Sequence, residues 1–445
     1  MLPIHVCAQA LSARCVSPSS CTTLLTQRSH TYGCQGGRAY LQEVPVEEMD
    51  WAYHVKSAQL PEPRDRDALH AFVGGLFADT MDVTKPMWQF HVVESMNGEG
   101  GVRSALVARV HHVMGDGTSL VWLFLSHLVD QPKVTATPRT RMASGKQKRR
   151  LDRGLLAPVR AVARQARNFV AGVANGFLTP MLSRDTDTVM KAKDALASGG
   201  ARVLSAARPI PVSKLKQIKE RIGGTINDVL VSLMVGAIRR YARVRVRVIL
   251  ELEEAAAPNF HEFAGRYLAA HGDAEAVDST STKFRCCFPI NVRPRGADIE
   301  ETFGNMFVLL SMAIPLHIED RVERLVEVKR LCDNMKTSPQ TPMTAAINKL
   351  AIKVLPTAAY MQLTQGMLDK FSVMFTNVIG PSEPVTVRGR RVEDLAFWVP
   401  TPVGNIGCLL SCTCCGRWSC GHCLSLCWRL QTVACVISLS LPHLL

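Results

Sequence analysis

Two adjacent histidines, an aspartate and a glycine stand together in the stretch ARVHHVMGDGTSL, residues 108–120. An imidazole exchanges protons near neutral pH, so His111 or His112 could act as the general base toward a substrate hydroxyl. Asp116 could fix the turn or pair with an arginine. Gly117 has no Cβ, which allows backbone or substrate to approach closely. The group therefore predicts general-base chemistry beside a cleft.

Two other interpretations of the same residues stay open. His111, His112 and Asp116 could supply three ligands to a metal ion. Adjacent residues that leave a strand point to opposite sides, however, so both imidazoles rarely reach one ion. The two histidines could also be hydrogen-bonded residues without a catalytic role. We expect no resident metal ion and no bound cofactor.

The elements on either side of the motif place it at a strand-to-helix turn, where side chains often face a cleft. Residues 104–110 are predicted to form a strand with three apolar residues on one face by period two: Leu106, Ala108 and Val110. Residues 119–128 carry apolar residues at helical spacing, and Thr118 is placed to cap that helix.

The chain has 445 residues, a length that favours two lobes over one core. We predict an α/β fold with an N-terminal lobe over 44–130, a basic linker over 131–205 and a C-terminal lobe over 206–407. Residues 243–282 are expected to be a surface insertion. Further elements are predicted as helices over 66–77, 226–241 and 320–335, strands over 89–94, 284–292, 306–314 and 372–377, and a hairpin over 385–392 that turns at Arg388-Gly389.

The net charge of +14 is concentrated in one segment, because residues 131–170 hold eleven Lys or Arg and one acid. Local charge without interleaved aromatic residues does not indicate nucleic-acid binding. No run of about 20 apolar residues predicts a membrane span. Of the fifteen cysteines, twelve lie before residue 35 or after residue 407, so the body of the chain is predicted to be a reduced, intracellular protein.

Within the basic linker, residues 155–177 form a regular amphipathic pattern with arginines opposite the apolar face. Such a helix could pack on a lobe with its arginines in water. It could equally lie in the headgroup region of a membrane, where each basic residue near an anionic surface adds about 1 kcal/mol.

Several motifs together resemble a known family. The segment HHVMGDG matches the HHxxxDG signature of chloramphenicol acetyltransferase-like acyltransferases and condensation domains. Pro86-Met87-Trp88 is similar to the Pro-Leu-Trp motif of the wax ester synthase/diacylglycerol acyltransferase family, and Asn227-Asp228 resembles that family's Asn-Asp helix start. The segments FPINVRPRG, GNMFVLLSMAIPL and TNVIGP follow in the family's order, so the resemblance runs from about residue 44 to residue 407.

The resemblance implies two chloramphenicol acetyltransferase-like lobes, each a mixed β-sheet with flanking helices. It implies that His112 is the general base and that Asn227 is a candidate donor to the oxyanion. Thr225 and Asp228 also form a capping-box pattern, which we favour for Asp228. Trp88 is expected in the core. An arginine, Arg293 or another, is expected to pair with Asp116.

The resemblance also implies an O-acyltransferase that moves an acyl group from acyl-CoA to a long-chain alcohol or diacylglycerol, without a covalent acyl-enzyme. Peripheral attachment to the endoplasmic reticulum, another membrane or a lipid droplet is expected, and otherwise a cytoplasmic location. Two alternatives are an acyltransferase of the same superfamily with another acceptor, and a catalytically inactive protein that binds lipid or a membrane surface.

Both ends depart from the family's pattern. The family's opening strand and helix are missing before residue 44, and the chain after Gly407 becomes rich in cysteine. We therefore expect residues 1–43 and 408–445 to lie outside the fold, and deletion of the latter to leave thermal stability unchanged. A zinc site built from the late Cys residues and His422 is the alternative, although the spacings lack two clean Cys-x-x-Cys pairs.

Overall fold

The computed structural model describes the chain in separate stretches. These are residues 30–35, 38–98, 101–130, 166, 184–186, 202–206, 210–255, 283–294, 296–378, 380–381, 383–398, 405–412, 417–425 and 432–440. For the last three stretches, as for 30–35, 38–43, 78, 98, 101–103, 202–206 and 242–255, only the course of the backbone is described. The amphipathic helix predicted over 155–177 thus lies outside the described residues, apart from Ala166.

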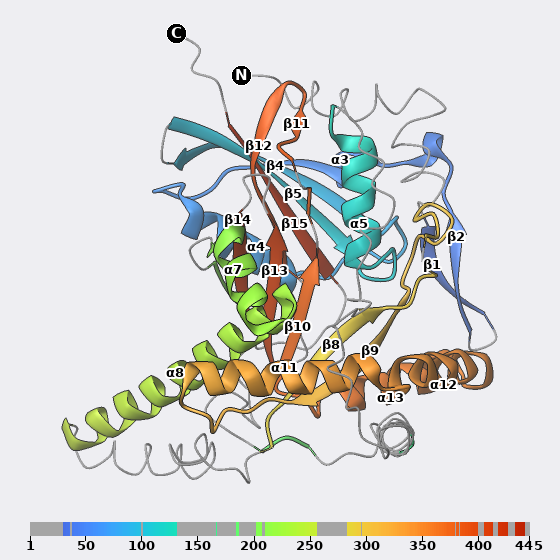
Figure 1. Cartoon of the computed structure of the whole chain (residues 1–445). Coiled ribbons are helices and arrows are strands. Elements are labelled where there is room, and N and C mark those ends of the chain that lie inside the picture. The colour runs from blue at the N-terminus through green and yellow to red at the C-terminus, as the bar shows by residue number, and fades with distance from the viewer. Residues whose placement is uncertain are drawn as a thin grey trace.

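A six-stranded sheet carries the histidine turn at the end of β5 (Figure 1). Its strand order is β11-β12-β15-β5-β4-β3, with β4 and β5 antiparallel neighbours. The predicted period of two is confirmed, because Leu106, Ala108 and Val110 contact one apolar cluster while Ala105 and Val107 lie in another. The strands are β3 (Val55–Ala58), β4 (Trp88–Gly98), β5 (Gly101–His111), β11 (Thr386–Val387), β12 (Arg390–Trp398) and β15 (Thr432–Ser440).

A seven-stranded sheet forms the second layer of strands. Its order is β6-β14-β13-β10-β8-β9, and β7 pairs with β14. β10 runs parallel to β8 and β13 while β8 and β9 are antiparallel, so the sheet is mixed, as expected. The strands are β6 (Arg202–Ala206), β7 (Ile210–Pro211), β8 (Arg285–Asn291), β9 (Phe307–Ala313), β10 (Val373–Val378), β13 (Asn405–Cys412) and β14 (Arg417–Ser425).

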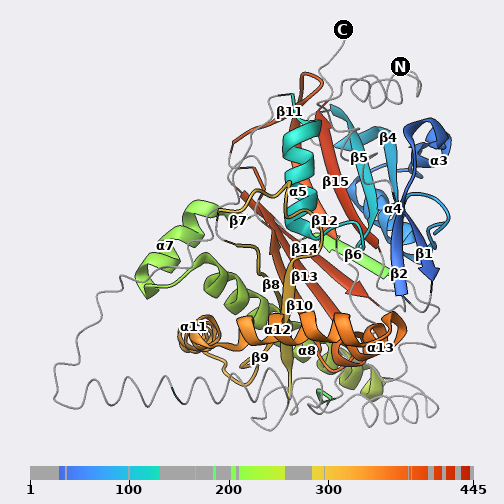
Figure 2. The same cartoon turned by 90° about the vertical axis from the view of Figure 1, so that its right-hand side faces the viewer.

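Helices cover both sheets. α4 packs on one face of the first sheet, and α5 with the π-helical turn that follows it packs on the other. α8 and α11 lie side by side against the second sheet (Figure 2). The helices are α3 (Trp51–His54), α4 (Arg66–Ala78), α5 (Gly117–Leu123), the π turn (Phe124–Leu128), α7 (Val212–Ile222), α8 (Ile226–Ala255), α11 (Arg321–Thr337), α12 (Gln340–Val354) and α13 (Thr357–Leu368).

Most of the elements predicted from the sequence are present with shifted ends. α8 continues to Ala255 and so enters the segment expected to be a surface insertion. The predicted hairpin is confirmed: Arg388 and Gly389 both have positive φ, 54° and 71°, as a tight turn between β11 and β12 requires. α12 and α13 were not predicted. No single helix in the described part of the chain is long and apolar enough to cross a membrane.

The late cysteine-rich segment lies inside both sheets, which corrects the expectation that it is separate from the fold. β13 and β14 extend the second sheet, and β15 pairs with β5 on one side and β12 on the other. The segment TVACVISLS is a short, continuous apolar run, typical of a strand buried on both faces. The cysteines of the preceding stretch, 408–427, obscured that pattern. Deleting residues 408–445 would remove interior strands. We therefore expect the deletion to cause a large loss of stability instead of leaving thermal stability unchanged.

The two sheets do not follow the predicted boundaries along the chain. β11 and β12 come from the segment predicted as the C-terminal lobe, yet they belong to the first sheet with β15. At the other end, β1 (His30–Gln35) and β2 (Arg38–Glu43) form a two-stranded hairpin that is part of neither large sheet. A 3-10 turn, Val46–Glu48, follows them.

Candidate active site

Asp116 fixes the turn after β5 through three hydrogen bonds. Its Oδ1 accepts the backbone N–H of Ser119 at 3.0 Å, which makes Asp116 the N-cap of α5. Its Oδ2 accepts from Arg293 Nη1 at 2.7 Å and from the backbone N–H of Met306 at 3.0 Å. The predicted cap, Thr118, was wrong because the carboxylate two residues earlier takes that position. Asp116 is 7% exposed and occupied by these partners, so its role here is structural.

Arg293, just after β8, joins the second sheet to this turn. Its Nη2 donates to Ser119 Oγ at 2.7 Å and to the carbonyl of Gly304 at 2.8 Å. Its Nε donates to the carbonyl of Thr302 at 3.1 Å. The sequence could not choose among arginines for Asp116, and the structure identifies Arg293. Because both charges are buried, loss of either would leave the other without its charged partner.

Gly117 lies where the two sheets meet. A Cβ added there would come within 2.9 Å of Val378 Cγ2, at the end of β10. Glycine therefore allows the start of α5 to press against the neighbouring sheet, as the sequence suggested for backbone contact. Gly115 is also close to its neighbours, since a Cβ there would lie 3.2 Å from that of Ser119.

The two histidines have different surroundings. His111 Nδ1 accepts the backbone N–H of Val113 at 3.2 Å, so this ring takes part in the turn itself. The ring of His112 packs edge-on against Phe307 of β9, with 5.7 Å between centroids. Its backbone carbonyl accepts from Asn305 Nδ2 at 2.7 Å. No described residue is recorded in a hydrogen bond with the His112 imidazole, and the residue is partly exposed.

Asp228 closes the capping box at the start of α8, as favoured from the sequence. Its Oδ2 accepts the backbone N–H of Thr225 at 2.7 Å, and Thr225 Oγ1 accepts the backbone N–H of Asp228 at 3.3 Å. Lys336 of α11 donates to Oδ1 at 2.8 Å. Burial opposes the charge of Lys336, but the bond to Asp228 and its negative charge raise the lysine pKa overall. Asp228 is fully buried, so it serves the helix rather than a substrate.

Asn227 points away from that cap and is exposed. Its Oδ1 accepts from Asn377 Nδ2 at 2.5 Å. Asn377 precedes Val378, the residue that contacts Gly117, so the end of β10 borders both the histidine turn and the start of α8. The structure thus brings Asn227 and the turn to one strand end. The Nδ2 amide of Asn227 has no recorded acceptor among the described residues.

Trp88 lies in the core beside the histidine turn, where it pairs with Val110 across β4 and β5 and shares an apolar cluster with Met114 and Val378. It is 2% exposed and packs 4.3 Å from the His54 ring and 6.4 Å from the Trp51 ring, between centroids. Its backbone carbonyl is hydrogen-bonded to His54 Nδ1 at 2.7 Å. The core position favoured from the sequence is confirmed.

Four residues at the site were not predicted individually: Ser119, Asn305, Phe307 and Asn377. Three lie in segments already noted as motifs, GNMF and TNVIGP, so the signal was present without a role for each side chain. Ser119 had no signal beyond its place after the motif. Among the described residues, no group of three or more His, Cys, Asp or Glu side chains could hold a metal ion. The late cysteines and His422 have no described side chains.

Comparison with known proteins gives two consecutive matches to one family. A model for the wax ester synthase/diacylglycerol acyltransferase catalytic domain matches residues 8–230, and a model for the WS/DGAT C-terminal domain matches residues 303–414. Two relatives in Arabidopsis thaliana are wax ester synthase/diacylglycerol acyltransferases 11 and 6. They are 25% and 22% identical over 74% of this chain, and the chain spans 66% and 65% of their respective lengths.

The fold agrees with these matches. A wax ester synthase/diacylglycerol acyltransferase from Marinobacter aquaeolei VT8 superposes with a TM-score of 0.52 at 16% identity, covering 95% of this chain and 84% of that one. At this identity the likeness supports the fold, and the family models support kinship. The chain belongs to the wax ester synthase/diacylglycerol acyltransferase family.

Proposed function

We propose that this chain is an O-acyltransferase that transfers an acyl group from acyl-CoA to a long-chain alcohol or to diacylglycerol. The proposal rests on the different surroundings of Asp116 and His112 in the turn after β5. Asp116 is occupied by Arg293 and two backbone amides, whereas the His112 imidazole stands partly exposed where the two sheets meet. Membership of an acyltransferase family supports the same reaction.

In the proposed reaction, His112 accepts the proton of the acceptor hydroxyl while its oxygen attacks the thioester carbonyl. An alcohol is a poor nucleophile, so a base within hydrogen-bond reach is needed at that moment. The tetrahedral intermediate then collapses, the C–S bond breaks and the imidazolium returns the proton to the departing thiolate. The products are an ester and coenzyme A, and no covalent acyl-enzyme is required.

The oxyanion of that intermediate needs a hydrogen-bond donor. Asn227 is the candidate, because its Oδ1 is engaged by Asn377 and its Nδ2 amide is directed elsewhere. The bond from Asn377 fixes the orientation of the Asn227 amide. Asn377 therefore acts as a positioning residue in this proposal, and Arg293 positions the histidine turn through Asp116.

The substrates and products would be nearly insoluble in water, so we also propose a peripheral location at a membrane or lipid-droplet surface, the endoplasmic reticulum among them. No resident cofactor is proposed, since acyl-CoA would be a co-substrate. The predicted amphipathic helix over 155–177 is one candidate for attachment.

Turnover by the purified full-length chain tests this function. The chain would be incubated with palmitoyl-CoA and either hexadecanol or dioleoylglycerol, with ester and free coenzyme A measured together. Equal formation of ester and coenzyme A, lost in His112→Ala, is expected. Coenzyme A release only with an amine acceptor would favour the related acyltransferase. Lipid binding by a folded chain without any turnover would favour the inactive lipid-binding protein.

A further inference from the structure

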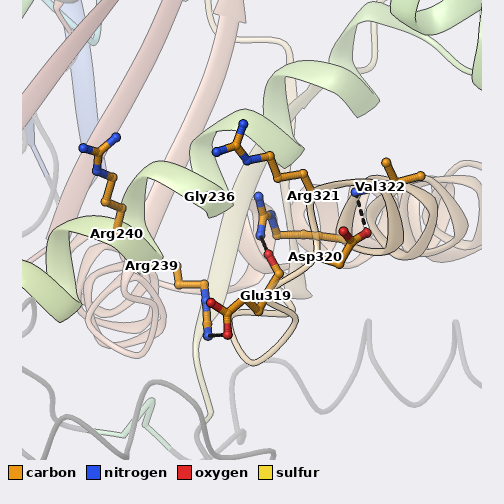
Figure 3. Close-up of a pocket in the computed structure, with 8 residues that line it drawn as sticks. Gly236, Arg239, Arg240, Glu319, Asp320, Arg321 and Val322 are labelled. Carbon is orange, nitrogen blue, oxygen red and sulfur yellow. Dashed lines mark hydrogen bonds and ion pairs between the residues drawn. The ribbon is translucent and has the colours of Figure 1, made fainter.

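A cavity of about 610 Å³ lies between α8 and the start of α11. Figure 3 shows its lining side chains, which come from α8, from the two residues before α11 and from the first turn of α11. Its volume is within the range of small-molecule sites. Half of the residues that line it are arginines, and the full set is Gly236, Arg239, Arg240, Glu319, Asp320, Arg321, Val322 and Arg324.

Two of the arginines are buried and donate hydrogen bonds to backbone carbonyls just before α11. Arg239 Nη1 donates to the carbonyl of Leu316, and Arg324 Nη1 donates at 3.0 Å to the carbonyls of Ile318 and Glu319. Burial lowers the pKa of Arg324, and the positive charges of Arg239 and Arg321 lower it further. Burial and these neighbouring positive charges both oppose the charge of Arg324, and an anion would relieve that repulsion.

The two acids of the cavity do not balance this charge. Asp320 caps α11, accepting the backbone N–H groups of Val322 at 2.9 Å and Glu323 at 2.8 Å. Glu319 is 74% exposed and reaches Arg239 at 3.6 Å. Arg240 and Arg321 are exposed, and no ion pair is recorded for either within the described part of the chain. Four cations against two carboxylates leave the cavity positive.

Exposed apolar side chains lie on the cavity and one helical turn away from it. Val322 is 67% exposed, and Val326, one turn further along α11, is 56% exposed. On α8, Leu233 is 46% exposed one turn before Gly236. Large apolar side chains beside a basic hollow suit a lipid interface better than a purely aqueous ligand, because the charges meet a headgroup while these side chains meet acyl chains.

We propose that this cavity binds the phosphate headgroup of an anionic phospholipid at a membrane surface. Guanidinium groups match phosphate oxygens in charge and geometry. The site is separate from the candidate active site: Gly236 is nine residues after Asn227, which is about 14 Å along α8 and on its opposite face. The proposal rests on the proposed function only in that lipid substrates give the chain a reason to bind membranes.

Vesicle flotation with the full chain tests the site, using phosphatidylcholine vesicles with and without phosphatidic acid. The chain should bind the acidic vesicles. The double variant Arg240→Glu/Arg321→Glu should bind them about tenfold more weakly or worse. The same change of charge in Lys214→Glu/Lys216→Glu, at exposed positions of α7, should leave binding within about twofold. Unchanged thermal melting of both variants would show that they are folded.

The remaining outcomes distinguish a lipid headgroup from a free phosphate ester as the ligand. They also distinguish failure of this site from failure of the proposed acyltransferase function. Equal losses in both double variants would overturn the site, since general charge would then explain binding. Saturable binding of glycerol 3-phosphate without binding to vesicles would overturn the lipid headgroup as ligand. Because flotation needs no turnover, a parent chain that makes no ester but binds acidic vesicles through Arg240 and Arg321 would refute the acyltransferase alone.

Discussion

Asp116 and Asp228 are built into the two lobes in the same manner but have different partners. Each carboxylate is buried, accepts a backbone N–H at a helix start and pairs with a cation. The cation of Asp116 is Arg293, which comes from the other sheet. The cation of Asp228 is Lys336, on the helix beside its own. The first pair joins the sheets, whereas the second joins two helices on one sheet.

The comparison shows that an acid inside a functional motif need not touch substrate. In each motif the carboxylate is held by hydrogen bonds and an ion pair within the protein. The nearby polar side chain lies close to where the sheets meet; it is His112 in the first motif and Asn227 in the second. The spacing of each motif therefore places a structural carboxylate as well as a side chain that could react. Four predictions follow from this division, beginning with the largest effect.

His112→Ala should lower ester formation about 10²–10⁴-fold, the usual contribution of a general base. His111→Ala should cost much less, because that ring bonds the backbone of Val113 inside the turn. Ester formation under saturating acyl-CoA, with melting curves of both variants, measures this. Similar mild losses in both variants would mean that neither histidine is the base.

Arg293→Ala should reduce the free energy of unfolding by about 3–5 kcal/mol, because it leaves the Asp116 charge buried without its partner. Lys336→Ala should cost less, about 1–3 kcal/mol, since Asp228 loses its cation but the Lys336 side chain is 31% exposed and water can replace part of its bond. Urea unfolding of the two variants compares them. A larger loss for Lys336→Ala would reverse the ranking of the two pairs.

Gly117→Ala and Gly224→Ala compare the backbone beside each acid. Both added methyl groups would meet an atom at 2.9 Å: Val378 Cγ2 for Gly117, and Ile222 Cδ1 for Gly224. Val378 is β-branched and fixed on a strand, whereas Ile222 presents the movable end of its side chain. Gly117→Ala should therefore cost about 1–3 kcal/mol and Gly224→Ala less. Adding Val378→Ala should recover part of the first loss, and no recovery would exclude this contact as the cause.

Alkaline pH should separate the two ion pairs. The pKa of Lys336 is raised above its ordinary 10.5 by Asp228, so its stabilising contribution is complete below pH 10.5 and is lost as pH rises through the folded value. Arginine keeps its charge. The difference in unfolding free energy between parent and Lys336→Ala should shrink above pH 10.5, and the Arg293→Ala difference should persist. A constant Lys336 difference up to pH 12 would contradict the assignment.

The features that were predicted correctly from the sequence are those set by residues close together along the chain. Period two in β5, the capping box at Asp228 and the Arg388-Gly389 turn each depend on neighbouring residues, and the structure bears them out. The sequence could not select Arg293 for Asp116, because 177 residues separate them. It also missed that α8 extends past Tyr241, since the charged, Ala-rich composition there favoured a surface insertion, and it misjudged β15 on composition alone.

The pairing of β15 with β5 has a consequence for the order in which the protein can form. His111 aligns with Thr432, so the strand that carries the histidines gains its second neighbour only after some 320 further residues have been made. Contacts between such distant segments form slowly, so one edge of β5 stays unpaired in the meantime. During synthesis, β5 would therefore present an open strand edge, the kind of surface that chaperones protect from aggregation.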